Sequence, residues 1–479
     1  MIALLKKDSG IAMPVVVAVI AIITLLGFTS VALVENQGSM GKRYEKSESA
    51  LSVAEAGVNE YLWRLNKDSR FYATPEGIDF VNDGGVPREH EFQNSDGIYT
   101  LEITEPTAAD PTVKIKSTGW IKGDENSKYA VDVDVRKRRF VQQIYLSGDE
   151  KDLSGEEVWW TTGDVVNGPF HTNGTLNIKG TPQFYGRVTY SNKVNGPNSG
   201  SNFHEGPPEK VEPLAFPLTN KQLKIQAKYN GYYFNGRTSI MLDGNSIKIK
   251  NKDNSVQTIT DLKNGVIYID GKVYKESYDN EKKADKWDPD LGNVFVSGKL
   301  NGRLTIAAAN DIYITGYDPT IYNWNSVKNN PTGGIMYYDT DFTFDEYGNV
   351  VSYSDGDDML GLVADQRIRI LHYGWFGTNS GSVALNSITI HAAIFALNKS
   401  YEFENHTQGD FDTIKLVGSI CQNRRGAVGT FNRYTGESES GYAHKNYSHD
   451  PRMAYDTPPH FLEPTNAGWE IVTWKKVSP

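Results

Sequence analysis

The chain has 479 residues, more than one ordinary domain, so two or three domains are expected. Its 45 glycines, 20 prolines and 27 tyrosines, with 38% hydrophobic and 23% charged residues, indicate a mainly β protein with many turns. The net charge of −10 argues against a nucleic-acid partner, and the single cysteine, Cys421, excludes an intramolecular disulfide.

An uncharged run occupies the N-terminal region. Lys6, Lys7 and Gly10 precede it, and it extends from Ile11 to Val34. At about 1.5 Å per residue, a helix of this length is long enough to cross a hydrocarbon core of about 30 Å. The two lysines predict a cytoplasmic N terminus, with the rest of the chain outside the membrane. A cut after Gly10 would leave the whole run in the mature protein.

This arrangement resembles the class III leader of type IV pilins and pseudopilins. The resemblance implies a leader over residues 1–10, which a prepilin peptidase removes after Gly10 before it methylates Ile11. It also implies a membrane and assembly helix over residues 11–65. The helix residues assigned to that role are Pro14, Val15, Leu25, Gly27, Val34 and Glu35. Most major pilins carry glutamate where this chain has Val15, but PilX-like minor pilins often lack it.

The helical pattern continues past Glu35. Apolar residues recur at three-, four- or seven-residue steps and therefore fall on one stripe: Met40, Tyr44, Leu51, Ala54, Val58, Leu62 and Leu65. The first half of such a helix suits lipid or a fibre core, and the second half suits packing on a sheet. The stretch Ala54-Glu55-Ala56-Gly57 resembles the PilX-type N-terminal region.

Three alternating runs then predict an antiparallel meander closed by the helix: Ile98–Glu105, Val113–Ile121 and Tyr129–Arg136. Residues 66–139 are therefore expected to form a pilin-like α+β head. The basic run from Arg136 to Arg139 is interpreted as a solvated linker rather than a DNA or lipid patch.

From Phe140 onward, short apolar pieces such as TLNIKG, GVIYIDG and GRLTIAA alternate with Gly or Asn. This spacing favours a β-solenoid, parallel β-helix-like body over residues 140–440, and an antiparallel β-sandwich is the alternative. An open end of the solenoid would need a cover, which the Pro- and aromatic-rich residues 441–479 are expected to supply as a cap. Residues 143–465 also resemble an uncharacterised domain family that follows PilX-like N termini in bacteria.

Candidate chemistry is sparse, and no cofactor or metal is expected. A group of acidic residues offers oxygen ligands for Ca²⁺ but lacks the EF-hand spacing: Asp339, Asp341, Asp345, Asp355, Asp357 and Asp358. The stretch FTFDEYGNVVSY is better explained as a hairpin that turns at Glu346–Asn349.

Two further candidates are interpreted as structural. Asp365, Arg367 and Arg369 alternate and would share a strand face, as salt-bridged residues do and as acid–base groups also could. His171 lies in a predicted turn, where it can satisfy backbone groups locally.

Two hypotheses from different classes follow. The first is a non-catalytic minor pilin or pilin-like surface protein, near the tip of a type IV pilus or a type II secretion-like filament. Its partners would be other pilins, the prepilin peptidase, the cytoplasmic membrane and a surface or polysaccharide ligand. The alternative is a membrane-anchored β-helical enzyme that acts on polysaccharide, which would need a groove with convergent carboxylates and Arg or Lys.

Overall fold

The computed structural model describes residues 12–68, 71–92, 95–106, 112–124, 127–137, 139–197, 202–252, 254–274, 285–375, 378–432, 437–454, 456–465 and 468–477. The predicted leader, with Gly10 and Ile11, lies outside these ranges. The chain divides into two compact units. Unit 1 contains the described residues of 1–107, 111–136 and 469–479, and unit 2 contains those of 137–468.

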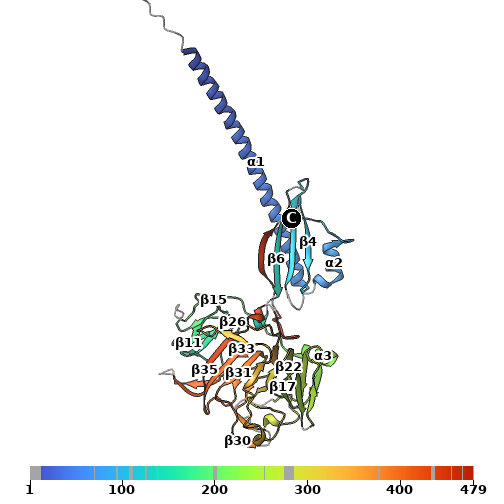
Figure 1. Cartoon of the computed structure of the whole chain (residues 1–479), viewed down its shortest axis with the longest axis vertical. Helices are drawn as coiled ribbons and strands as arrows, with labels where there is room; N and C mark the ends of the chain where they lie inside the picture. Colours follow the sequence, from blue (N-terminus) through green and yellow to red (C-terminus); the bar gives the residue numbers. More distant parts are fainter. Residues whose placement is uncertain are drawn as a thin grey trace, which may run out of the picture. The chain divides into compact units, whose positions relative to one another are not determined.

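Unit 1 combines one long helix, α1 (Ala12–Lys67), with a five-stranded sheet in the order β3-β4-β5-β6-β36 (Figure 1). The central strands β4, β5 and β6 pair antiparallel and lie where the alternating runs predict them. The other elements of unit 1 are η1 (Phe71–Ala73), α2 (Pro75–Val81), β1 (Asn82–Asp83), β2 (Val86–Pro87), β3 (His90–Glu91), β4 (Gly97–Thr104), β5 (Val113–Ile121), β6 (Tyr129–Lys137) and β36 (Trp469–Val477).

Small residues allow the C-terminal half of α1 to approach the sheet closely. Ala54 is fully buried, and a Cβ atom at Gly119 of β5 would lie 2.4 Å from the Ala54 backbone nitrogen. On the helix side, a Cβ atom at Gly57 would lie 2.6 Å from Ser117 Oγ and from Cδ2 of Tyr99. Glu55 and Ala56 lie between these contact residues and are half-buried. The Ala54–Gly57 stretch is thus a helix–sheet contact.

The N-terminal half of α1 extends past the sheet of unit 1 (Figure 1). Among the side chains described there, Val16, Val17, Val19, Ile20 and Ile23 are 47–63% exposed. The side chains assigned to assembly lie outside the described part of this half: Pro14, Val15, Leu25, Gly27, Val34 and Glu35.

The predicted single-pass membrane localisation is not supported. Within the described residues, no helix combines the length and the apolar character that crossing a bilayer requires.

The C-terminal segment is not the predicted cap over residues 441–479. Its first part belongs to strand β35 (Ser438–His449) of unit 2, and its last part is the edge strand β36 of unit 1. The indole nitrogen of Trp469 donates to the Leu65 carbonyl (3.1 Å), and Thr473 Oγ1 donates to Asp134 (2.7 Å). The sequence shows a strand-like pattern here. It does not show which sheet the strand joins, because the two contacts link residues that are 404 and 339 positions apart in the chain.

Unit 2 is built on one 22-stranded, mainly parallel sheet with smaller sheets and hairpins beside it. The first half of the unit contains η2 (Phe140–Gln142), β7 (Tyr145–Asp149), β8 (Trp160–Thr161), β9 (Val165–Asn167), β10 (Phe170–Thr172), β11 (Leu176–Lys179), β12 (Gln183–Phe184), β13 (Val188–Tyr190), β14 (Val194–Asn195), β15 (Glu209–Lys210), α3 (Lys221–Asn230), β16 (Tyr232–Asn235), β17 (Thr238–Gly244), β18 (Ser246–Asn251), β19 (Gln257–Ile259), β20 (Val266–Asp270) and η4 (Asp285–Trp287). The second half contains β21 (Val294–Leu300), β22 (Arg303–Ala308), β23 (Ile312–Ile314), α4 (Trp324–Val327), β24 (Gly334–Tyr337), β25 (Phe342–Phe344), β26 (Val350–Tyr353), β27 (Met359–Ala364), β28 (Ile368–Ile370), β29 (Tyr373–Trp375), β30 (Thr378–Ser382), β31 (Ile388–Ala396), β32 (Tyr401–Phe403), β33 (Asp410–Arg424), β34 (Gly429–Phe431), β35 and η5 (Pro451–Ala454).

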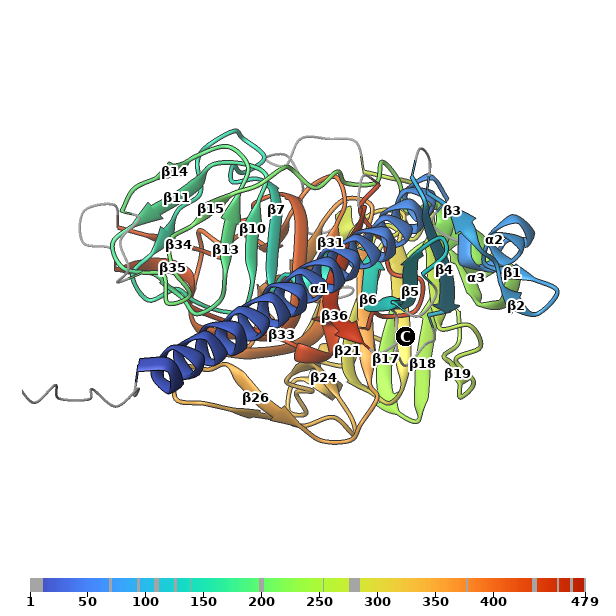
Figure 2. The same cartoon turned by 90° about the horizontal axis from the view of Figure 1, so that it is seen from above.

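The predicted solenoid of successive coils is wrong, because strands from the start and the end of unit 2 pair with each other. The antiparallel sandwich alternative is also wrong, because most strand pairs of the body are parallel. Strand β33 pairs with β31 and also with β7, and β35 pairs with β9. The earliest strands of unit 2, drawn in teal, therefore lie beside the latest ones, drawn in orange (Figure 2). A solenoid in chain order would place each coil against the next instead. Alternation of apolar and polar residues reveals that one face of a strand is buried, but it does not reveal which strand is the neighbour.

Apolar side chains fill both faces of this sheet. The larger core cluster contains Ile306, Leu362 and Ile394, and the second contains Phe395, Met453 and Leu223 of α3. Parallel strands covered on both faces appear in sequence as continuous apolar runs, as in MLGLVA of β27, where every residue is buried. Glycine is required where strands bend: Gly418 has φ +149, and a Cβ atom there would lie 2.0 Å from the Ala392 carbonyl oxygen.

Candidate functional site: a groove beneath the β25–β26 hairpin

A groove of about 610 Å³ lies between the β25–β26 hairpin and one face of the sheet of unit 2. Strands β33, β35 and β9 form its floor, and the residues of the hairpin turn, 344–348, line the opposite side. The antiparallel pairing of β25 with β26 confirms the hairpin that the sequence predicts. The sequence did not predict that β35 lies under this turn, because the two segments are far apart in the chain. Ser448 and Gly348, which are in contact, are 100 residues apart.

Strand register brings the polar residues of the floor together. Thr413 and Lys415 alternate with the buried Ile414 and Leu416 of β33, so they face outward. On β35, His444 lies opposite Thr413, and Asn446 lies opposite Lys415. Lys415 and His444 are exposed. No ion pair of the Lys415 ammonium is found within the described residues.

The hairpin turn is held rigidly against the floor. Asp345 accepts hydrogen bonds from the backbone nitrogens of Tyr347 (3.0 Å) and Asn349 (2.8 Å), which closes the turn. Ser448 Oγ donates to the Gly348 carbonyl (2.7 Å). Gly348 has φ +89, and a Cβ atom there would lie 2.8 Å from Asn167 Nδ2, so a larger residue would push the turn away from β9.

Aromatic rings line the open side of the groove. Phe344 and Tyr347 are 45% and 51% exposed. The Tyr347 ring lies 5.1 Å from that of Tyr185, which in turn stacks on His204 at 4.1 Å. Rigid rings that offer a flat apolar face beside polar groups are typical of ligand-binding surfaces.

One charged pair lies at the end of the groove. Lys445 Nζ contacts Asp164 Oδ1 at 2.6 Å, and Asp164 also accepts a hydrogen bond from the Thr161 backbone nitrogen (2.9 Å). The Asp164 side chain is almost fully buried, so its charge is balanced by Lys445 and is not free to act on a ligand. Lys415 is therefore the cation of the floor that a ligand can reach.

The acidic residues considered for calcium serve the backbone instead. Asp358 accepts from the backbone nitrogens of Gly302 (2.7 Å), Asp339 (2.7 Å) and Thr340 (2.9 Å), and Asp345 closes the hairpin turn. Among the described residues, which include all six aspartates, no group of three metal-ligating side chains is found. The carboxylates of Asp345 and Asp358 are thus engaged by backbone nitrogens of their own turn or of neighbouring segments.

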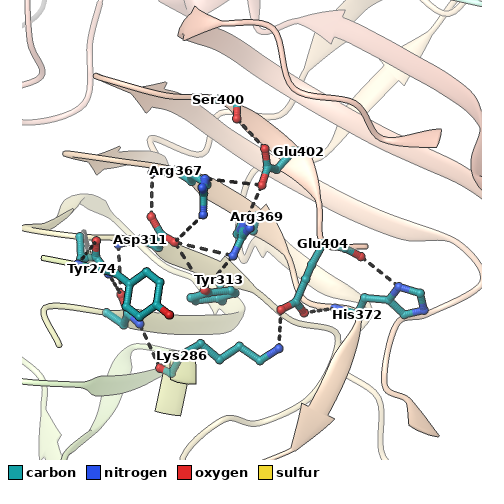
Figure 3. Close-up of polar contacts among 12 residues, drawn as sticks. Tyr274, Lys286, Asp311, Tyr313, Arg367, Arg369, His372, Ser400, Glu402 and Glu404 are labelled. Atoms are coloured by element: carbon teal, nitrogen blue, oxygen red, sulfur yellow. Dashed lines mark hydrogen bonds and ion pairs between the residues drawn. The ribbon is translucent and has the colours of Figure 1, made fainter. Parts of the chain in front are cut away.

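Arg367 and Arg369 lie in a buried network of charges (Figure 3). Arg369 Nε donates to Glu402 (2.8 Å), and its Nη1 donates to the Tyr313 hydroxyl (3.1 Å). Asp311 lies 3.9 Å from Arg367 Nη1 and 3.8 Å from Arg369 Nη1. Burial alone would raise the pKa of Glu402, but the charges of Arg369 and Arg367 outweigh it and hold the pKa below its ordinary value. The carboxylates and the arginines of this network are therefore paired and enclosed.

Asp365 lies in the turn after β27, Arg367 immediately precedes β28, and only Arg369 lies within that strand. Burial raises its pKa above the ordinary value. The predicted alternation holds for Arg367 and Arg369 only, and the structure does not bring the three residues together as a catalytic set.

A second buried ion pair adjoins this network. Lys286, which is 1% exposed, contacts Glu404, and the other oxygen of Glu404 accepts from the backbone nitrogens of His372 (3.0 Å) and Tyr373 (3.2 Å). Burial would raise the pKa of Glu404, but Lys286 and Arg369 lower it below its ordinary value. The pair joins Lys286 of η4 to Glu404, in the turn directly after β32, and Glu404 in turn contacts His372 (Figure 3).

The remaining sequence candidates have structural roles. His171 lies in strand β10 and not in the predicted turn, and its ring nitrogens contact Thr189 Oγ1 of the neighbouring strand β13 (2.8 Å) and Asn173 Oδ1 (2.9 Å). Cys421 is fully buried, and burial raises the pKa of its thiol, so the thiol is unreactive. In the basic run, Arg136 pairs with Glu470 (3.1 Å) and Lys137 with Glu463 (3.2 Å), which reduces its charge.

A histidine near the hairpin gives the fold a dependence on pH. His391 Nδ1 accepts a hydrogen bond from the Tyr337 backbone nitrogen (3.2 Å), so this nitrogen carries no proton. Burial lowers the pKa of His391 to about 4, with Asp341, Asp450 and Arg452 as the charged groups that face it. In the unfolded chain the pKa would be about 6.5.

We expect the stability of unit 2 to fall as the pH decreases from about 7.5 to 5, because the unfolded state takes up a proton at His391 and the folded state does not. Of the loss in the free energy of unfolding over this pH range, about 2 kcal/mol should be due to His391. Burial also lowers the pKa values of His406 and His449, so a variant must isolate the effect. His391→Asn keeps an acceptor for the Tyr337 backbone nitrogen. Denaturation curves of this variant at the two pH values should show a difference in the free energy of unfolding that is smaller by the His391 contribution. Equal pH dependence in both proteins would contradict the assignment.

Comparisons with known proteins give two findings. A family model described as Domain of unknown function (DUF4900) matches residues 115–192, from β5 to just beyond β13. Among solved structures, the chain is similar to the competence-associated pilin ComZ from Thermus thermophilus, with 12% sequence identity, a TM-score of 0.29, and coverage of 90% of this chain and 97% of that chain. No curated protein matches. The matched stretch is too short to assign a family, and at this TM-score the similarity does not establish a shared fold.

Proposed function

We propose that the protein is a non-catalytic, pilin-like subunit of a surface filament, in which α1 packs among the helices of other pilins and unit 2 binds a surface partner. The observation that carries this proposal is the division of α1. Its C-terminal half is fitted to the sheet through Ala54 and Gly57, and its N-terminal half bears apolar side chains without a partner in the described part of the chain.

The exposed apolar residues require a partner outside this chain. Burying each valine or isoleucine side chain would contribute about 1.5–3 kcal/mol, so a helix that exposes several of them is unstable as a free surface. Helices of other pilin subunits, which carry apolar residues at corresponding positions, provide such a partner. A prepilin peptidase that cuts after Gly10 is the processing partner in this proposal, and mass spectrometry of isolated filaments would detect a mature N terminus at methylated Ile11.

The absence of catalysis is also part of the proposal. The alternative, a polysaccharide-active enzyme, needs convergent carboxylates together with Arg or Lys in a groove. Of the acidic residues that line the groove, Asp345 is engaged in the hairpin turn. Glu346 is the other acidic residue among the described lining residues, and its carboxylate is hydrogen-bonded to the Tyr347 side chain. This geometry supports binding rather than hydrolysis.

We further propose that the subunit occupies the tip of the filament. In major pilins, the glutamate at the position of Val15 is held by the N-terminal amine of a neighbouring subunit. Val15 cannot make this contact, and a subunit at the tip has no neighbour ahead of it. Unit 2, which extends over residues 137–468, would also crowd a shaft if it were present on every subunit.

The test uses a cysteine introduced on the exposed half of α1. Because Cys421 is buried and unreactive, Ile20→Cys provides a selective attachment point for a photo-activated cross-linker. In filaments of the native host, we expect cross-links from position 20 to other pilin subunits. Tyr229→Cys, at a residue that is 86% exposed on α3, is the matched control and should give no cross-link to pilins.

Two results would contradict the proposal. Filaments in which position 20 gives no cross-link to another pilin would refute the helix contact. Antibodies against residues 150–479 should label filament ends, and dense labelling along whole shafts would refute the tip position.

A further inference from the structure

We infer that the groove beneath the β25–β26 hairpin binds an acidic polysaccharide, whose sugar rings pack on Tyr347 and Phe344 and whose carboxylates contact Lys415. The acidic polysaccharide would be the surface partner in the proposed function. The inference rests on the proposed function only for the biological setting of this binding. The binding chemistry depends on the residues of unit 2 alone.

The shape of the groove fits a chain that passes through it. Its volume of about 610 Å³ is large enough for a few sugar rings, and its floor runs across the neighbouring strands β33, β35 and β9. The contact between Ser448 and the Gly348 carbonyl holds the turn of the hairpin on this floor without covering it. A rigid site of this kind loses little conformational entropy when a ligand binds.

The aromatic side chains provide the stacking surface. The axial C–H groups of a pyranose form an apolar patch that packs against a flat ring, while the hydroxyl groups remain free for hydrogen bonds. Tyr347 and Phe344 are both about half exposed. The contacts from Tyr347 to Tyr185 and from Tyr185 to His204 extend the row of rings beyond the groove.

The floor provides polar contacts opposite these rings. Lys415 and Asn446 are direct neighbours across β33 and β35, and His444 lies opposite Thr413 one pair further along. Asn446 Oδ1 accepts a hydrogen bond from Asn167 Nδ2 (3.4 Å), so the NH₂ group of Asn446 points away from Asn167. An ammonium beside amide and imidazole groups can hold a carboxylate by charge-assisted hydrogen bonds.

Charge decides between an acidic and a neutral glycan. Lys445 is neutralised by Asp164, the Asp345 carboxylate is occupied by the hairpin turn, and the Glu346 carboxylate is hydrogen-bonded to the Tyr347 side chain. The exposed Lys415 has no carboxylate partner within the described residues, so a uronate group would supply the missing counter-charge. Because the whole chain has a net charge of −10, binding depends on this local contact rather than on long-range attraction.

The experiment is calorimetric titration of the full-length protein with three acidic glycans: oligogalacturonate, oligoalginate and oligohyaluronate. Neutral oligogalactoside and oligomannoside of similar length are the matched ligands. We expect saturable binding of at least one acidic glycan, weaker binding as salt is raised, and no comparable binding of the neutral ones.

Two variants locate the site. Lys415→Gln should weaken binding of the acidic glycan about tenfold, as expected for the loss of one charge-assisted hydrogen bond. Tyr347→Ala should weaken it by a similar factor through loss of stacking. Lys328→Gln, at the exposed residue that follows α4, and Tyr229→Ala, at an exposed residue of α3, are the matched controls and should bind like the unaltered protein. Unchanged thermal midpoints would show that the variants remain folded.

The inference is overturned if none of the acidic glycans binds, if neutral glycans bind equally well, or if the groove variants behave like the controls. Any of these results would leave the filament proposal intact, because that proposal is tested by cross-linking at position 20. Conversely, failure of the cross-linking would not affect the titration.

Discussion

Glu404→Gln is expected to destabilise unit 2 by about 3–5 kcal/mol, because it removes one charge of a buried ion pair and leaves the other. Lys286 is 1% exposed, so its ammonium cannot regain water in the folded state. Glutamine keeps the size of the side chain and can still accept from the backbone nitrogens of His372 and Tyr373. The substitution therefore isolates the charge. Amide hydrogen exchange of peptides from β28 and β32 measures the change for unit 2 alone.

The double variant Lys286→Met/Glu404→Gln is the control. It removes both charges and should recover most of the lost stability, to within about 1.5 kcal/mol of the unaltered protein. Exchange rates that remain as fast in the double variant as in Glu404→Gln would mean that the contacts of the lysine side chain, rather than its unpaired charge, determine the stability of this region.

Gly57→Ala is expected to destabilise unit 1 by about 2–3 kcal/mol, because the added methyl group overfills a closely packed helix–sheet contact. Its carbon would lie 2.6 Å from both Ser117 Oγ and Cδ2 of Tyr99. The Tyr99 ring cannot easily move away, since its hydroxyl donates to Glu60 and its ring stacks on His90. Faster amide exchange in β4 and β5 would report the loss.

The same substitution elsewhere in α1 should have the opposite effect. A Cβ atom at Gly41 would meet no atom within 4 Å, so Gly41→Ala should only improve helix propensity and stabilise the helix locally by about 1 kcal/mol. If both variants changed stability in the same direction, close packing at Gly57 would not be the cause. Gly119→Ala should resemble Gly57→Ala, because its methyl group would meet the backbone of α1.

The groove illustrates how far local patterns lead. The hairpin over residues 342–353 could be predicted because an Asp-Glu-Tyr-Gly-Asn turn separates two alternating runs, and β-turn chemistry is local. Lys415 and His444 gave no signal of their own, since each is an ordinary polar residue on the exposed face of a strand. They become a candidate site only because β33 pairs with β35 in a particular register and the hairpin is held over both.

The sequence by itself determined the features that depend on neighbouring residues. These include the three antiparallel strands of unit 1, whose alternation and short links are local, and the structural role of Asp345 in its turn.

Only the tertiary structure decided the features that depend on distant partners. These are the pairing of β33 with β7, the addition of β36 to the sheet of unit 1, and the enclosure of Arg369 with Glu402. The physical reason is that backbone hydrogen bonds are the same for every strand, and many Val- and Ile-rich strands in this chain present equivalent faces. The choice among such partners is made by the packing of the complete core, which no local pattern records.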